Sequence, residues 1–106
     1  MLHKKDYCIE DMRCNARSTS GWRRDLSAKY NDPRNGRSAN LLETLSVDLK
    51  HLTDSQFAEL EPYLTSNGWS SAVSLVCRQV GFKHADTLDA FVARLVSTLQ
   101  SQAVAA

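Results

Sequence analysis

The sequence has few of the residues from which catalytic loops are commonly made. Only four of its 106 residues are glycine and two are proline. It contains no glycine-rich phosphate loop, no G-x-S-x-G and no H-E-x-x-H, the patterns that cradle a phosphate, present a nucleophile or hold a zinc ion. We therefore expect a protein that is not an enzyme, with no catalytic residue, no bound cofactor and no small-molecule substrate.

Long apolar runs are also missing. None approaches the ~18 residues that a membrane span needs, and the basic start is not followed by the apolar stretch of a secretory signal. The odd number of cysteines, Cys8, Cys14 and Cys77, argues against a disulfide framework. The spacing of His3, Cys8 and Cys14 matches no compact zinc site. These absences predict a cytoplasmic protein with reduced thiols, no metal and no membrane partner.

Helical periodicity is what the sequence does contain. Between residues 38 and 52, leucines recur at spacings of four, four and three, the pattern of an amphipathic helix. Thr53 and Gln56 then form a capping box, which predicts a second helix that starts at Thr53 and folds back on the first as a helical hairpin. Pro62 ends that second helix.

A third helix is expected after a capping residue at Ser66 or Asn67. Its apolar residues, from Trp69 to Val80, cover an arc of roughly 200° at about 100° per residue. Gly81 follows in the position of a helix-ending glycine. An apolar face that broad is wider than a small bundle covers, and an uncovered apolar face is usually an interface.

The fold class that we predict is all-α. A fourth helix is expected to begin at Asp86 or Thr87. The expected organisation is a flexible segment over residues 1–19 and a single helical domain over residues 20–106, made of a short basic helix (22–30), a turn (31–37) and a bundle (38–100), with four to five short helices in all.

Residues 76–92 raise one further interpretation. The letters VGF, followed by Leu88 and Phe91, give a spacing that resembles the helix-turn-helix of AraC-type regulators. A helix that reads the major groove presents Arg, Lys, Asn or Gln near its start. This one presents Asp86 and Asp89, which phosphates repel. We therefore expect two packed helices joined by a glycine turn and assign no family.

The function that these patterns favour is a helical protein–protein interaction or regulatory adaptor module without enzymatic activity. Its partner is expected to be another protein or a second copy of the chain, and self-association is the favoured case. Aromatic residues and the broad apolar arc supply the candidate contacts. The candidate interface residues are Trp22, Tyr30, Trp69, Leu75 and Val76.

A nucleic-acid-binding regulator is the alternative function. The net charge is +1, yet residues 1–37 hold nine Lys or Arg against five Asp or Glu, while residues 38–106 hold four against seven. Arginine suits phosphate contacts, and aromatic residues among arginines can stack on bases. The same basic residues could instead pair with the acidic remainder of the chain. The candidate phosphate-contacting residues are Arg13, Arg17, Arg23, Arg24, Lys29, Arg34 and Arg37.

Overall fold

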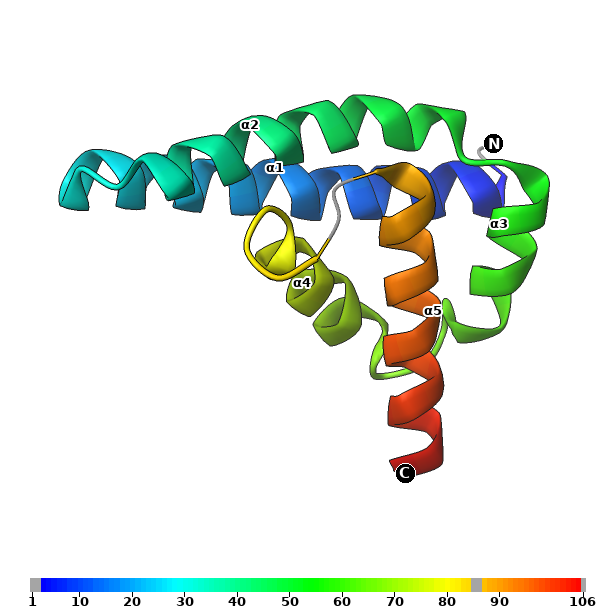
Figure 1. Ribbon diagram of the computed structural model, residues 1–106. Coiled ribbons are helices and arrows are strands. Elements are labelled where there is room, and N and C mark those ends of the chain that lie inside the picture. The colour runs from blue at the N-terminus through cyan, green and yellow to red at the C-terminus, as the bar shows by residue number, and fades with distance from the viewer. Residues whose placement is uncertain (1–2, 85–86, 106) are drawn as a thin grey trace.

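The structure, a computed structural model, describes residues 3–84 and 87–105 (Figure 1). Within these residues the chain forms helices and no strand, which confirms the predicted all-α class. The α-helices are α1 (Lys4–Tyr30), α2 (Pro33–Asp48), α3 (Asp54–Leu60), α4 (Trp69–Gln79) and α5 (Leu88–Ala105). The short 3-10 helices η1 (Leu49–His51) and η2 (Glu61–Tyr63) follow α2 and α3. No helix in this part of the chain is long and apolar enough to cross a membrane.

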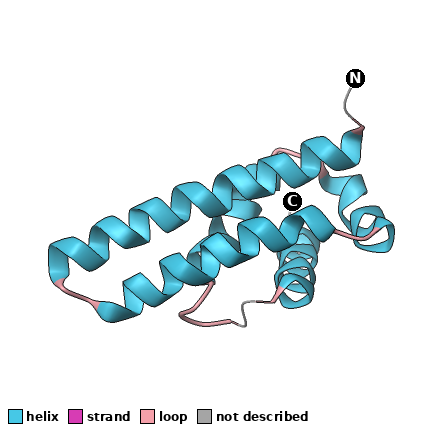
Figure 2. Ribbon diagram, turned by 90° about the horizontal axis from the view of Figure 1, so that it is seen from above, coloured by secondary structure: helices cyan, strands magenta, loops and turns pink. Residues whose placement is uncertain are grey.

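Helices α1 and α2 form an antiparallel hairpin and lie side by side in Figure 2. The chain reverses within two residues. Asn31 takes a left-handed conformation with φ 49°, which asparagine tolerates better than most residues. Asp32 caps α2 by accepting a hydrogen bond from the backbone N–H of Arg34 at 3.0 Å. Pro33 occupies the first helical position, where no N–H is required.

Helix α1 is much longer than the predicted helix over residues 22–30. Most of the segment expected to be flexible, residues 1–19, belongs to it. Its buried face includes Cys8, Met12 and Ala16, spaced four residues apart. Cysteine and alanine give only a weak hydrophobic pattern, so the period is hard to recognise in the sequence. Packing against α2 and α4 stabilises a helix whose own residues are mostly polar.

The predicted turn over residues 31–37 is also wrong, because Asn35 and Gly36 lie in the first turn of α2. The Asn35 side-chain amide donates a hydrogen bond to Oδ2 of Asp32 at 2.8 Å. Its Oδ1 accepts one from Arg23 at 3.1 Å. The Asn-Gly pair therefore belongs to a capped helix start, and not to a turn.

Helices α3, α4 and α5 lie on one side of the α1–α2 hairpin (Figure 1). The predicted capping box is present, since the Thr53 hydroxyl accepts from the Gln56 N–H and the Gln56 side chain accepts from the Thr53 N–H. Pro62 lies in η2, directly after α3, as predicted. The hairpin expected at Thr53 is wrong, however, because α3 turns away from α2 and does not lie back along it (Figure 1).

The start of α4 differs from the prediction. Gly68 precedes the helix, and no side chain caps it, whereas Ser66 or Asn67 was expected in this role. The Ser66 hydroxyl instead donates a hydrogen bond to the carbonyl of Tyr63 at 2.8 Å. It therefore stabilises the turn between η2 and α4.

The end of α4 and the start of α5 agree with the sequence pattern. Gly81 follows α4 with φ +78°, the conformation that favours glycine. The Thr87 hydroxyl accepts a hydrogen bond from the Ala90 N–H at 3.3 Å, as a helix cap does. The other predicted cap, Asp86, lies outside the described residues.

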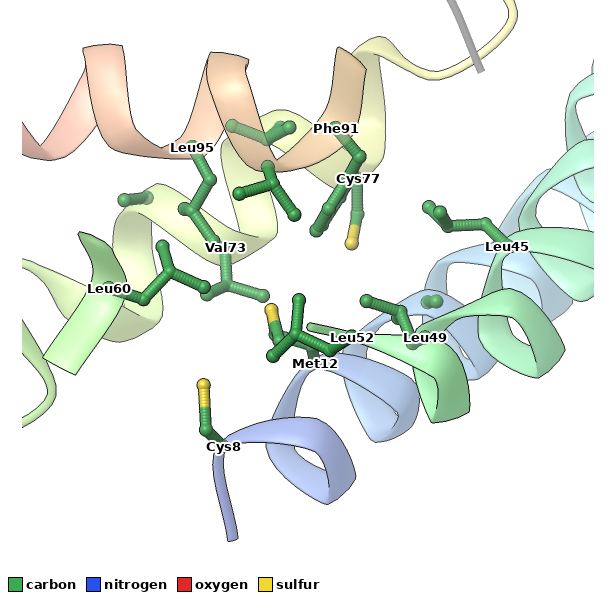
Figure 3. Close-up of a cluster of buried hydrophobic side chains, with 14 of the residues drawn as sticks. Cys8, Met12, Leu45, Leu49, Leu52, Leu60, Val73, Cys77, Phe91 and Leu95 are labelled. Carbon is green, nitrogen blue, oxygen red and sulfur yellow. The ribbon is translucent and has the colours of Figure 1, made fainter. Parts of the chain in front are cut away.

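The core lies between the hairpin and the three remaining helices (Figure 3). Helix α4 packs against both α1 and α5. Trp69, Val76 and Cys77, members of its broad apolar arc, are therefore buried inside the chain. This corrects the expectation of a large uncovered face on this helix. The largest fully buried side chains include Met12, Leu42, Leu45, Leu49, Leu60, Val73, Phe91, Leu95 and Leu99.

Candidate interaction surface

Arg23 joins three elements at the place where α1, α2 and the loop after α4 meet. Its guanidinium donates one hydrogen bond to Oδ1 of Asn35 at 3.1 Å and another to the backbone carbonyl of Arg78 at 2.7 Å. The same group lies 4.5 Å from the ring centre of Trp22 and 4.1 Å from that of Phe82. Both distances are typical of cation–π contacts. Arg23 therefore fixes two aromatic rings relative to each other.

Positive charge is concentrated at this point. Burial lowers the pKa of Arg23 from its usual value, and the charge of Arg78 lowers it further. The Arg78 guanidinium also lies 5.9 Å from the ring centre of Trp22. An anionic group that approached the indole would be attracted by both guanidinium groups.

The outer side of this arrangement is apolar. Trp22 is 46% exposed, Phe82 is 39% exposed, and Leu75, one turn before Arg78, is 44% exposed. We call Trp22, Arg23, Leu75, Arg78 and Phe82 the arginine–aromatic patch. Tryptophan and arginine are enriched among the residues that dominate binding energy at protein interfaces. The patch therefore has the composition of a protein-binding surface.

A shallow hollow continues this surface along the seam between α1 and α4. It is lined by Asn15, Ser70, Ser71, Ser74, Leu75 and Arg78. We call it the serine hollow, and it shares Leu75 and Arg78 with the patch. Its small side chains allow another chain to approach the α4 backbone closely.

A groove of about 600 Å³ lies at the other end of the same seam. We call it the acidic groove, because Glu10, Asp11 and Glu61 line it and Lys4 is its one basic residue. Asp11 accepts a hydrogen bond from the indole Nε1 of Trp69 at 2.5 Å. The full lining is Lys4, Tyr7, Cys8, Glu10, Asp11, Cys14, Glu61, Leu64, Thr65 and Trp69.

The three thiols of the chain differ in their surroundings, and Cys8 and Cys14 are the two that line this groove. Burial, followed by the negative charge of Asp11, raises the pKa of Cys8 to about 12. Burial alone raises the pKa of Cys77 to about 12. Both thiols are protonated at neutral pH, and a protonated thiol is neither a nucleophile nor a metal ligand. Cys14 is exposed.

The described residues contain no group of three or more His, Cys, Asp or Glu side chains that could hold a metal ion. His84 is paired with Arg94, whose Nη2 lies 2.8 Å from the imidazole Nδ1. Desolvation, followed by the positive charges of Arg94 and Lys83, lowers the pKa of His84. A neutral His84 ring is therefore suited to accept a hydrogen bond from Arg94.

The structure separates the residues of the predicted interface. Trp22 and Leu75 lie in the arginine–aromatic patch, and Tyr30 is exposed two turns further along α1. Trp69 and Val76 are 5% and 3% exposed, so both belong mainly to the core, and Trp69 reaches the surface as part of the lining of the acidic groove. Arg78 and Phe82 were missing from the prediction. Phe82 could have been found from the sequence, because it is a large apolar residue directly after the helix-ending Gly81.

The predicted phosphate contacts are also divided. Besides Arg23, four of these residues have acceptors within the chain: Arg13 binds Glu10 at 2.7 Å, Arg24 binds Glu43 at 2.6 Å, Arg34 binds Asp32 at 3.4 Å, and Arg17 donates to the Sγ of Cys14 at 3.8 Å. Arg13 also donates to the Ser46 carbonyl at 2.8 Å. Arg17, Lys29 and Arg37 are exposed and form no ion pair within residues 3–84 and 87–105. The basic segment thus does not form one continuous free surface.

Comparison with known proteins gives no relative for this chain, since no protein family, no curated protein and no solved structure matches it.

Proposed function

We propose that this chain is a non-enzymatic protein–protein interaction module that binds its partner through the arginine–aromatic patch. The observation that carries the proposal is the exposed pair of rings, Trp22 and Phe82, held by the guanidinium of Arg23. A regulatory or adaptor role in the cytoplasm follows as part of the same proposal. The free thiols of its three cysteines are in keeping with that compartment.

Contacts that hold the aromatic rings in place before a partner arrives favour binding. A flexible exposed side chain loses conformational freedom when a partner covers it, and this loss weakens binding by about 0.5–1.5 kcal/mol per side chain. Trp22 is already held by Arg23, and Arg23 is held by Asn35 and the Arg78 carbonyl. The patch is therefore preorganised.

The chemistry of the partner follows from the patch. Its charged members, Arg23 and Arg78, are both positive, and its apolar members are Trp22, Leu75 and Phe82. A complementary surface carries carboxylates beside apolar side chains. We therefore expect a protein surface that is both acidic and apolar.

Nucleic-acid binding remains the alternative function, because an indole close to two guanidinium groups could also stack on an unpaired base. It is the weaker proposal. Five of the seven candidate phosphate-contacting residues already donate to acceptors within the chain, and Arg17, Lys29 and Arg37 are the ones that are exposed without an ion pair among the described residues.

Site-specific photo-crosslinking in the cells that produce the protein tests the proposal. A photoreactive amino acid is placed at Leu75, within the patch, and in a matched variant at Val47, an apolar residue of α2 that is 53% exposed. A discrete protein adduct from position 75 that is absent from position 47 supports the proposal. A nucleic-acid adduct from position 75 favours the alternative. Equal adducts from both positions, or none from position 75, would overturn it.

A further inference from the structure

The arginine–aromatic patch is one end of a longer surface. Along the seam between α1 and α4, the acidic groove lies at the level of Asp11 and Trp69, which hydrogen bond to each other. The serine hollow follows, beside Asn15 and Ser74. The patch comes last, where Arg78 lies near Trp22. Helices α1 and α4 therefore run in the same direction along this seam.

The two ends of the seam carry opposite charge. The patch contains Arg23 and Arg78, whereas the acidic groove contains three carboxylates and Lys4. Each end also offers apolar surface. Trp22 and Phe82 are exposed at the basic end, and Tyr7, which lines the groove, is exposed at the acidic end. Each end of the seam is thus complementary to the other.

We propose that the partner is a second copy of this chain, bound seam to seam in antiparallel orientation about a two-fold axis. This inference rests on the proposed function, because it names the occupant of the same patch. The axis passes through the serine hollow, so the patch of each copy faces the acidic groove of the other. Charge complementarity selects this orientation. A parallel arrangement would place Arg78 against Arg78 and Glu61 against Glu61, and like charges in direct opposition are unfavourable.

The dimensions fit an interface of ordinary size. From Tyr7 to Trp22, α1 rises about 22 Å at 1.5 Å per residue. A stable interface commonly buries about 800 Å² on each partner, equivalent to a square of about 28 Å on a side, and α1 reaches about 27 Å when the seam is taken from Lys4, which also lines the acidic groove. Two-fold dimers are also the commonest closed assemblies, and they leave no free end from which a filament could grow.

The antiparallel arrangement makes a specific prediction for charge reversal. Arg78→Glu places a carboxylate opposite the acidic groove of the partner, and Glu61→Arg places a guanidinium opposite the patch. Each variant alone should weaken the dimer by roughly tenfold or more, because both symmetry-related contacts become repulsive. A mixture of the two variants should dimerise as the unmodified chain does. In that heterodimer the patch of the Arg78→Glu chain faces the groove of the Glu61→Arg chain, so both charges are reversed and still attract each other. The other patch and groove keep their original charges.

Sedimentation velocity over a concentration series, from micromolar to several hundred micromolar, measures how far the unmodified full chain, each variant and the mixture of variants form dimers. Arg37→Glu, at an exposed site on α2 that has no ion pair with any described residue, makes the same change in net charge as Arg78→Glu and should leave the dimer unaffected. Circular dichroism of each variant checks that the helices remain intact. Arg78 and Glu61 are both exposed and form no ion pair in the part of the chain that the structure describes, so the fold should tolerate these changes.

Dimerisation of the unmodified chain, its loss in each single variant and its recovery in the mixture together support the proposal. A monomer at all concentrations would overturn it. It would also be overturned by a dimer that Arg78→Glu leaves unchanged, or by a variant that binds the unmodified chain more tightly than the chain binds itself. A chain that is monomeric here but yields an adduct with a different protein at position 75 would refute the dimer and leave the proposed function standing.

Discussion

The indole Nε1 of Trp69 donates a hydrogen bond to the Asp11 carboxylate at 2.5 Å, and this bond joins the start of α4 to α1. Trp69 is 5% exposed, so its N–H has little access to water when the acceptor is removed. We expect Asp11→Ala to lower the free energy of unfolding by about 1–3 kcal/mol. Urea denaturation followed by circular dichroism measures this change.

Asp25→Ala is the matched control for Asp11→Ala. Asp25 is an exposed carboxylate on the same helix, and it forms no ion pair among the described residues. Its replacement should change the free energy of unfolding by no more than about 0.5 kcal/mol. Equal losses in the two variants would show that the contact between Asp11 and Trp69 contributes nothing specific.

Replacement by alanine should destabilise the fold at Gly81 and stabilise it at Gly21. Gly81 has φ +78°, and a Cβ there would lie 3.1 Å from the Cα of Ser38. Gly81→Ala should therefore cost about 1–2 kcal/mol for the backbone conformation alone. This loss corresponds to a fall in melting temperature of at least about 4–8 °C.

Gly21 lies inside α1, and no atom is near enough to contact an added Cβ. Gly21→Ala should stabilise the fold by about 0.5–1 kcal/mol, because alanine loses less freedom than glycine in a helix. Differential scanning calorimetry of both variants measures these shifts. A melting temperature that rises with Gly81→Ala would contradict the tight approach of the loop to α2.

The buried thiols predict a loss of stability at alkaline pH. Burial raises the pKa values of Cys8 and Cys77 from 9.0 to about 12. Above pH 9 the unfolded chain has lost these protons while the folded chain keeps them. The free energy of unfolding should therefore fall as pH rises from 9 toward 12, by about 1.4 kcal/mol per pH unit for each thiol. Below pH 9 this contribution is fully present and constant.

Urea denaturation between pH 8 and 10.5 measures that slope. Lysine and tyrosine side chains also titrate in this range, so the informative quantity is the difference between variants. Cys77→Ala should remove about half of the contribution of the buried thiols, and Cys14→Ser, at an exposed position, is the matched control. Identical slopes in all three proteins would be evidence against the burial of Cys77.

Glutamate substitutions at two adjacent residues of α4 should distinguish a surface position from a core position. Leu75 is half-exposed and Val76 is buried. Leu75→Glu should therefore abolish association and preserve helical content, since the carboxylate remains in water. Val76→Glu should unfold the chain, because a buried carboxylate without a partner is costly. Circular dichroism and sedimentation velocity distinguish the two results, and loss of helical content in Leu75→Glu would place this residue in the core.

The elements that the sequence predicts well are those with strong local signals. The leucine spacing within residues 38–52 and the capping box at Thr53 both depend on near neighbours in the chain. Helix α1 lacks such a signal, because its buried residues include Ala16 and Ser20, which are small or polar. It is stabilised by its long contact with α2, which no local pattern reveals.

The candidate site was only partly predictable for a related reason. Trp22 and Leu75 stand out in the sequence as large apolar residues among polar ones. The contact between Arg23 and Arg78, by contrast, joins positions 55 residues apart, and Phe82 becomes part of the site only because the loop after α4 returns to α1. Trp69 is more buried than the sequence suggests, because α1 covers one side of the apolar arc of α4 and leaves this residue only in the lining of the acidic groove.

Helices α1 and α4 form the seam and also contribute much of the core. Binding at the seam therefore depends on the chain being folded. A partner on the seam binds only the folded chain, so its binding free energy adds to the stability of the fold. The melting temperature of a seam-to-seam dimer rises with protein concentration. The basic segment is consequently not a detachable arm, since α1, which carries most of its arginines, also buries Met12 and Ala16.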